Sequence, residues 1–247
     1  MRRFSLALLA AASTLVLAQI ASAADMSVKA PVYRPPVVMP LYNWTGFYAG
    51  LNLGGSWGSQ DNSLTTLSGV SLLSNSDHLN GLIGGGQIGF NYQVNQWVFG
   101  LEADFQGSAQ KTDGNFSIPA VGALPSTSIA YTNKLDWFGT VRGRIGYAID
   151  RWLPYVTGGW AYGHGQFSGT TTAGSTATSF SANPDYTAGW TVGAGVEWAF
   201  VNNWSAKIEY LYIDFGNGPT VPVSATQNIV SGKMTDNIVR AGVNYKF

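Results

Sequence analysis

After a proline-rich stretch, the chain alternates apolar and polar residues in eight separate segments. In the last of them, residues 237–247, Val239 and Val243 fall on one face of an extended strand, and Arg240 and Lys246 fall on the other. A period of two predicts β-strands with one apolar and one mostly polar face. The eight segments are residues 44–57, 82–92, 97–106, 136–147, 152–162, 187–198, 204–212 and 237–247.

The links between these segments alternate in length. Three links are tight and carry turn-forming residues, namely Asn95-Gln96, Asp150-Arg151 and Asn202-Asn203. Four links run to about twenty residues and are rich in Ser, Thr, Gly and Asn, namely 59–78, 109–133, 165–185 and 216–235. Each segment has roughly the 9–11 residues that a tilted strand needs to cross a bilayer. The sequence therefore predicts an all-β fold, an eight-stranded antiparallel up-and-down transmembrane β-barrel with short periplasmic turns and long outer loops.

Aromatic residues cluster beside the short turns and at the carboxy end, where they predict the lower interfacial girdle of a membrane protein. This predicted girdle comprises Tyr92, Trp97, Tyr147, Trp152, Trp198, Trp204, Tyr245 and Phe247. Trp57, Trp137, Trp160 and Trp190 lie near the other strand ends. An ordinary enrichment of aromatics in strands is the alternative explanation.

The composition changes this picture little. Only 11% of residues are charged, against about 25% in ordinary soluble domains. The region after the amino-terminal segment contains no apolar run of the 18 residues that a membrane helix requires. The chain has no Cys, which excludes disulfides and thiolate chemistry.

The first 23 residues resemble a secretory signal peptide. Arg2 and Arg3 form a positive start, an apolar run follows, and Ala21-Ser22-Ala23 offers a cleavage site. A membrane anchor is the alternative, but the apolar run is short for one. Cleavage leaves 11 basic and 13 acidic residues, a formal net charge of −2. A charge so near neutrality gives no support for nucleic-acid binding.

Residues 24–43 contain four of the ten prolines and show no apolar periodicity. This composition predicts an extended periplasmic linker rather than part of a core. The domain organisation expected from the sequence is a signal peptide over 1–23, the linker over 24–43 and the barrel over 44–247.

Several motifs resemble one family. Asn43-Trp-Thr-Gly-Phe-Tyr-Ala-Gly50, after its proline-rich leader, resembles the start of the small porin-like outer-membrane proteins of alphaproteobacteria, often called outer-membrane immunogenic proteins. The resemblance extends to Pro154-Tyr155-Val156, 158–163, 207–210 and 240–247. It implies an eight-stranded barrel in the bacterial outer membrane without a separate peptidoglycan-binding domain. It implies no established chemistry.

The chain ends on Phe247, with Tyr245 and Val243 at the alternate positions before it. This ending resembles the carboxy-terminal signal by which the barrel-assembly machinery recognises its substrates. We therefore expect these three residues to act in assembly.

The polar faces of four predicted strands carry charges that we expect to meet at one depth inside the barrel. They are Glu102, Asp104, Arg142, Arg144, Lys207, Glu209 and Arg240. Eight strands enclose only enough space for side chains, so these charges are expected to pair and to plug the interior. A gated pore is the alternative.

Other chemical motifs have simpler explanations. Gly84-Gly-Gly-Gln-Ile-Gly89 matches the spacing of a dinucleotide loop, but it lies inside a strand pattern, where glycines help a barrel wall to curve. His78 and His164 fall in or near predicted outer loops, without the partners that a hydrolase or a metal site needs. We therefore expect no catalytic site, no cofactor and no metal.

The sequence favours a structural role in envelope integrity and surface contact. A narrow channel for ions or small solutes is the second hypothesis, and adhesion or ligand binding, for example of haem, through the outer loops is the third. The expected partners are outer-membrane lipid, lipopolysaccharide and the barrel-assembly machinery. Peptidoglycan, a host surface and the oligomeric state are left open.

Overall fold

The computed structural model describes residues 42–120, 122 and 125–247. Their ten strands are β1 (Gly46–Thr66), β2 (Ser71–Val94), β3 (Trp97–Ile118), β4 (Thr127–Tyr147), β5 (Trp152–Ala173), β6 (Thr176–Ala182), β7 (Asp185–Val201), β8 (Trp204–Asn217), β9 (Thr220–Pro222) and β10 (Gln227–Lys246). Residues 42–120, 122 and 125–247 contain no helix long and apolar enough to cross a bilayer. The predicted signal peptide and all but the last two residues of the predicted linker lie outside the described residues.

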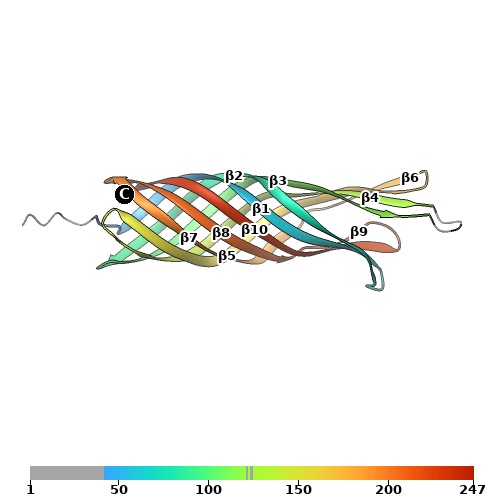
Figure 1. Cartoon of the computed structure of the whole chain (residues 1–247), viewed down its shortest axis with the longest axis horizontal. Helices are drawn as coiled ribbons and strands as arrows, with labels where there is room; N and C mark the ends of the chain where they lie inside the picture. The colour runs from blue at the N-terminus through green and yellow to red at the C-terminus, as the bar shows by residue number, and fades with distance from the viewer. Residues whose placement is uncertain (1–41, 121, 123–124) are drawn as a thin grey trace, which may run out of the picture. The chain divides into compact units, whose positions relative to one another are not determined.

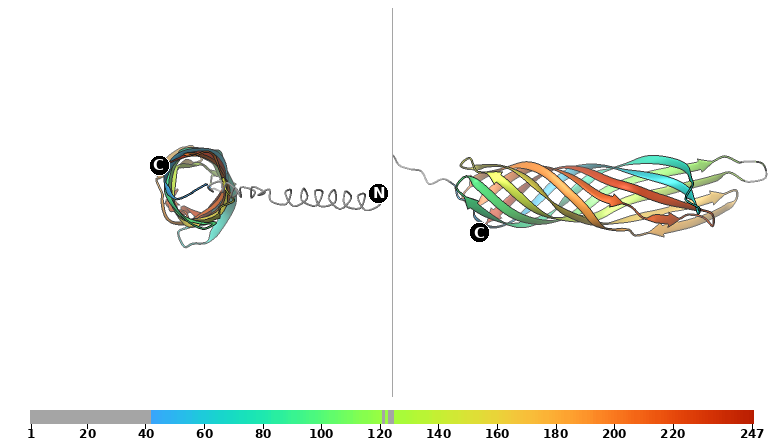
Figure 2. Two further views of the ribbon diagram at one scale, coloured as in Figure 1. Left: turned by 90° about the vertical axis from the view of Figure 1, so that its left-hand side faces the viewer. Right: turned by 90° about the horizontal axis from the view of Figure 1, so that it is seen from below.

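Eight of the strands form a closed antiparallel ring. The ring runs β1-β2-β3-β4-β5-β7-β8-β10, and β1 also pairs with β10, which closes it (Figure 1). Viewed along its axis, the strands trace a ring (Figure 2). The two short strands β6 and β9 pair only with β5 and β10. The eight-stranded barrel predicted from the alternation is confirmed, and its closure leaves no free edge in a solvent that offers no hydrogen bonds.

The three short turns lie where the sequence placed them. Asn95 and Asp150 adopt positive φ angles of 55° and 53° in two of these turns. Asn and Asp tolerate this left-handed region better than other non-glycine residues, so the local sequence suits the turn. The carboxy-terminal strand ends on the same side, because the Phe247 N–H donates to the Phe47 carbonyl at 2.9 Å.

Much of the four long links consists of paired strand. The first one, residues 59–78, continues as paired strand up to Thr66 and resumes at Ser71, so that only a tight turn separates β1 from β2. The ring strands are 14 to 24 residues long, more than the 9–11 residues of the prediction. The barrel wall therefore extends well beyond the length that crosses a bilayer.

The outward face of the wall changes character along each strand. On β1, Leu51 and Leu53 point outward and are 73% and 66% exposed. Farther along the same strand, Ser59 and Asp61 are the exposed residues, while Leu64 points inward and is fully buried. The outward face is therefore apolar in the lower part of the barrel, whereas in the upper part apolar side chains such as Leu64 lie inside, together with buried polar ones such as Asn62. The lower part suits lipid and the upper part suits water.

Three buried apolar clusters fill much of the interior. The periplasmic cluster comprises Trp44, Val98, Ala148, Leu153 and Ala199. The middle cluster comprises Leu79, Ile83, Leu135, Phe138, Ala161, Tyr186, Leu211, Ile213, Phe215, Met234 and Ile238. The outer cluster comprises Leu64, Phe116, Ile129, Tyr131, Phe167, Val221, Val223 and Ile229. The middle and outer clusters give the upper barrel a core like that of a soluble domain.

Tyr42, which we expected to belong to the linker, packs against the periplasmic cluster. Tyr42 packs edge-on against Trp44 at 4.8 Å between ring centroids, and the Trp44 indole donates to the Asp150 carbonyl at 3.1 Å. Trp44 is only 2% exposed. The ordered barrel therefore begins before its first strand.

Two glycines of β2, Gly86 and Gly89, differ in how closely other residues pack against them. The Tyr48 ring lies across Gly89, and a Cβ at Gly89 would come within 2.4 Å of that ring. Gly86 points the other way, and a Cβ there would meet its nearest neighbour at an ordinary 3.7 Å. Gly89→Ala should lower the free energy of unfolding by about 1–3 kcal/mol because of overpacking.

The matched control is Gly86→Ala, which should leave stability unchanged or slightly raised. Urea unfolding from lipid vesicles, followed by gel mobility, measures both. Equal losses in the two variants would contradict the packing that we describe.

Candidate functional site

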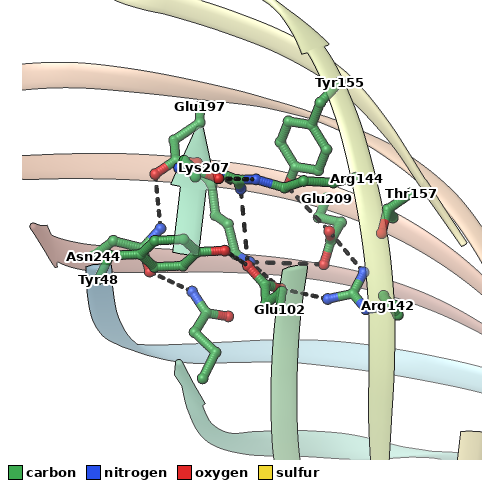
Figure 3. Close-up of polar contacts among 12 residues, drawn as sticks. Tyr48, Glu102, Arg142, Arg144, Tyr155, Thr157, Glu197, Lys207, Glu209 and Asn244 are labelled. Carbon is green, nitrogen blue, oxygen red and sulfur yellow. Dashed lines mark hydrogen bonds and ion pairs between the residues drawn. The ribbon is translucent and has the colours of Figure 1, made fainter. Parts of the chain in front are cut away.

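The lower barrel interior holds the seven charged residues that the sequence singled out. Glu102 and Asp104 come from β3, Arg142 and Arg144 from β4, Lys207 and Glu209 from β8 and Arg240 from β10. The register places Glu102 opposite Arg142, and Arg240 opposite Glu209. Because successive residues of a strand point to opposite faces, residues two apart enter the lumen together. The structure brings all seven side chains into one network. Figure 3 shows five of them, namely Glu102, Arg142, Arg144, Lys207 and Glu209.

Arg142 is the centre of this network. Its Nη2 lies 2.5 Å from Glu102 Oε1 and 3.0 Å from Asp104 Oδ2, and its Nη1 lies 2.9 Å from Glu209 Oε1. Its Nε donates to the Thr140 hydroxyl at 2.9 Å. One guanidinium therefore joins carboxylates from two strands on opposite sides of the ring, and its planar fork of donors suits such bridging.

Arg240 and Lys207 close the network from β10 and β8. Arg240 Nη2 lies 2.9 Å from Asp104 Oδ2 and 2.7 Å from Glu209 Oε2. Lys207 Nζ lies 2.9 Å from Glu102 Oε1. Each of these three carboxylates thus contacts two or more cations, which offsets the cost of removing the charges from water.

Arg144 forms an ion pair with Glu197, a residue that was not among the seven charges predicted from the sequence. Its Nη1 lies 2.9 Å from Glu197 Oε2 on β7, and Glu197 also accepts hydrogen bonds from Ser205 and Asn244. Glu197 lies on the same polar face as its strand neighbours and opposite Lys207 in register. The alternation places Glu197 on the polar face, but its ion-pair partner Arg144 lies on β4, which is not a neighbour of β7 in the ring.

Two tyrosines complete the site. The Tyr48 and Tyr155 rings each lie 5.0 Å from the Arg144 guanidinium. The Tyr48 hydroxyl donates to Glu102 at 2.7 Å, and the Tyr155 hydroxyl donates to Glu209 at 3.0 Å. Both rings pack against the cation through their faces, an attraction that strengthens when water is excluded. Sequence alternation placed Tyr48 on the polar face without indicating this role.

The network is neutral and closed to solvent. It contains four carboxylates and four cations, and their side chains are at most 3% exposed. Paired in this way, the charged groups can hold the strands together and fill the lumen. Within the described residues, no group of three or more His, Asp or Glu side chains is arranged to hold a metal ion.

The two histidines lie on other parts of the barrel. His78 is exposed on β2. His164 Nδ1 lies 2.6 Å from Asp185 Oδ1, and its ring stacks on Trp137 with centroids 6.0 Å apart. Neither residue belongs to the interior network.

The aromatic residues flanking the short turns lie on the outer surface as cross-strand pairs. The ring centroids are 5.4 Å apart for Trp97 and Tyr147, 5.6 Å for Trp152 and Trp198, and 5.1 Å for Trp204 and Tyr245. The exposed girdle residues are Tyr92, Trp97, Tyr147, Trp152, Trp198, Trp204, Tyr245 and Phe247. Amphipathic rings favour the boundary between hydrocarbon and water, and the exposed positions of these residues agree with the predicted girdle.

A second belt lies toward the other end of the apolar band. Trp137 stacks on Phe105 with centroids 5.3 Å apart, and Trp190 contacts Tyr212 at 5.5 Å. The Trp160 indole donates to the Thr187 carbonyl at 2.9 Å. We call this set, with Trp57, the upper aromatic belt. Beyond it the outward side chains are mostly polar, although Leu67 and Val70 at the tip of the β1–β2 hairpin are also exposed.

A closed eight-stranded barrel with an outward apolar band between two aromatic belts defines an integral outer-membrane β-barrel. Residues 4–247 match the family described as the outer membrane protein β-barrel domain, and the chain belongs to this family. It is 38% identical over 234 residues to the 31 kDa outer-membrane immunogenic protein of Brucella melitensis, covering 92% of this chain and 93% of that protein. The expected family and the outer-membrane localisation are thereby confirmed.

Two further proteins are similar. The 22 kDa outer membrane protein of Rhizobium leguminosarum is 32% identical over 219 residues, covering 85% of this chain and 81% of that protein. The crystal structure of the outer membrane protease OmpT from Escherichia coli superposes with a TM-score of 0.52 at 12% identity, covering 82% of this chain and 97% of OmpT. The second likeness shows a shared fold and nothing about activity.

Arg142→Ala tests the energetics of the network. The substitution leaves three buried carboxylates without their shared partner, and we expect a loss of about 3–5 kcal/mol in the free energy of unfolding. Urea unfolding from lipid vesicles measures the loss.

The control for this substitution is Lys111→Ala, which removes an ion pair with Asp113 that is 3.1 Å long and exposed at both ends. Exposed pairs contribute little because water screens them. Its stability should therefore stay close to that of the unsubstituted protein. A similar loss in both variants would contradict a special role for the interior network.

Proposed function

We propose that this protein is a non-conducting structural barrel of the outer membrane, whose outer extension makes contacts at the cell surface. The observation that carries the proposal is the charge network, because eight paired and buried charges occupy the lumen at the depth of the membrane. An ion would have to separate these pairs in order to pass, and breaking buried pairs is costly.

The apolar clusters support the same proposal. The periplasmic cluster lies between the network and the short turns, and the middle cluster lies on the opposite side of the network. Dry apolar layers at two further depths oppose the passage of hydrated ions. A narrow channel, the alternative hypothesis, requires both layers and the network to open together.

We extend the proposal to the absence of catalysis. Each acid and base of the network is paired within it, away from any substrate. The family relatives are named as immunogenic or outer membrane proteins rather than for an activity.

Assembly and surface contact form the remaining part of the proposal. Val243, Tyr245 and Phe247 share the outward face of β10 and its end, with exposed fractions of 43%, 38% and 75%. This face is accessible for recognition by the assembly machinery. The outer extension exposes polar side chains on well-paired hairpins, which suits contact with lipopolysaccharide or a host surface.

Single-channel recording in a planar bilayer tests the closed lumen. The refolded protein, with folding verified by its heat-sensitive gel mobility, should give no repeatable conductance steps. A porin of known conductance in the same bilayer serves as the positive control. Regular steps that change in size or ion selectivity on Glu102→Gln would contradict the proposal and establish the channel.

A further inference from the structure

Two lysines face each other across β3 and β4 on the outer surface of the barrel. Lys111 and Lys134 are direct partners in the strand register. Both are exposed, whereas their neighbours Gln110 and Leu135 point inward and are 1% exposed. Like charges directly opposite each other destabilise an antiparallel pair. A bound anion or a nearby acidic side chain would offset the repulsion between these two lysines.

The nearby acids balance this pair only in part. Asp113 Oδ2 lies 3.1 Å from Lys111 Nζ, and Asp113 Oδ1 accepts a hydrogen bond from the Thr132 hydroxyl at 2.6 Å. That hydrogen bond, together with Lys111, lowers the pKa of the Asp113 carboxyl. Among the described residues, Lys134 forms no ion pair within 4.0 Å, although Asp136 lies two residues away on the same strand. One cation thus stays available on the outward face.

The depth of the pair corresponds to that of lipid headgroups. On β4, Lys134 lies three residues beyond Trp137 of the upper aromatic belt, roughly 10 Å along a strand. That belt marks the boundary of the hydrocarbon. The headgroups of membrane lipids lie just outside this boundary, within reach of a flexible lysine side chain.

A hollow lies directly beyond the lysines on the same outward face. It has a volume of about 510 Å³ and is lined, among others, by Asp113, Thr132, Ser168, Thr170, Ser179 and Phe180. Asp113 and Thr132 are each two residues farther from the membrane than the lysine on their strand. Hydroxyls, one carboxylate and an aromatic ring are groups that hydrogen-bond and stack on sugars. The volume lies within the usual range for ligand sites, about 300–1,000 Å³.

We propose that Lys111 and Lys134 bind a phosphate of a phosphorylated glycolipid in the outer leaflet, and that the hollow takes the sugar next to that phosphate. The lipid source follows from the position of the pair, which lies on the outer surface just beyond the upper aromatic belt, at the level of the headgroups. The phosphate relieves the repulsion between the lysines. Asp113 stays on the sugar side, where its carboxylate accepts hydrogen bonds from hydroxyl groups.

Binding of purified phosphorylated glycolipid to the full mature protein in nanodiscs tests this site. Lys111→Gln/Lys134→Gln should weaken the binding about tenfold or more, since each lysine near an anionic membrane surface contributes measurably to attraction. Lys111→Arg/Lys134→Arg should retain most of the affinity. Lys233→Gln, which removes an outward lysine elsewhere on the outer extension, should bind like the unsubstituted protein.

Three further ligands test the phosphate contact, the sugar contact and the lipid source separately. The dephosphorylated glycolipid should bind as weakly to the unsubstituted protein as the intact one binds to the double glutamine variant. A glycolipid truncated next to its phosphate should bind more weakly than the intact one, and equal binding would overturn the role of the hollow. Inorganic phosphate should compete only weakly.

Three results would overturn the site itself. They are unchanged affinity in Lys111→Gln/Lys134→Gln, an equal loss in Lys233→Gln, and competition by inorganic phosphate as effective as that by the glycolipid. The last result would assign the pair to a free anion. Because the lysines lie outside the lumen, none of these results depends on whether the barrel conducts.

Discussion

The eight-stranded ring encloses room for side chains and little else, and this constraint governs the rest of the structure. Charged groups inside such a ring are removed from water, so each of them must be stabilised by an ion pair with a side chain from another strand. Arg142 meets this need by bridging β3 and β8, and Arg144 does so by reaching β7. The side chains that fill the barrel also connect strands that are not neighbours in the ring.

The outer surface of the barrel faces lipid in its lower part and water in its outer extension. Around the network, the outward residues are apolar and the inward ones are charged, whereas beyond the upper aromatic belt the inward residues form the apolar outer cluster together with buried polar side chains such as Asn62 and Asp77. A single alternating strand meets both demands because the pattern shifts phase along its length, as between Leu53, which points outward, and Leu64, which points inward. The outer extension is thereby a water-facing barrel built on a lipid-facing one.

The sequence predicted the parts of this fold that local pattern determines. Alternation predicted the eight strands, and Asn95 and Asp150 predicted turns whose backbone suits them. The long hairpins were missed because the inward positions of residues 59–78 are mostly polar, with Leu64 beside Gln60 and Asn62, so no apolar alternation marks them. Glu197, Tyr48 and Tyr155 were missed because their contacts cross the lumen, and the sequence contains no register between strands that are not neighbours.

The account rests most directly on the exclusion of water from the lumen, and the absence of cysteine in the chain makes this measurable. Ser56 and Ser205 are buried inside the barrel, at 4% and 6% exposure, and Ser59 is exposed outside it. Single cysteines at these three positions, treated with a small charged thiol reagent in lipid vesicles, should react rapidly only at position 59. Rapid labelling at positions 56 and 205 would show a water-filled lumen and contradict the closed barrel.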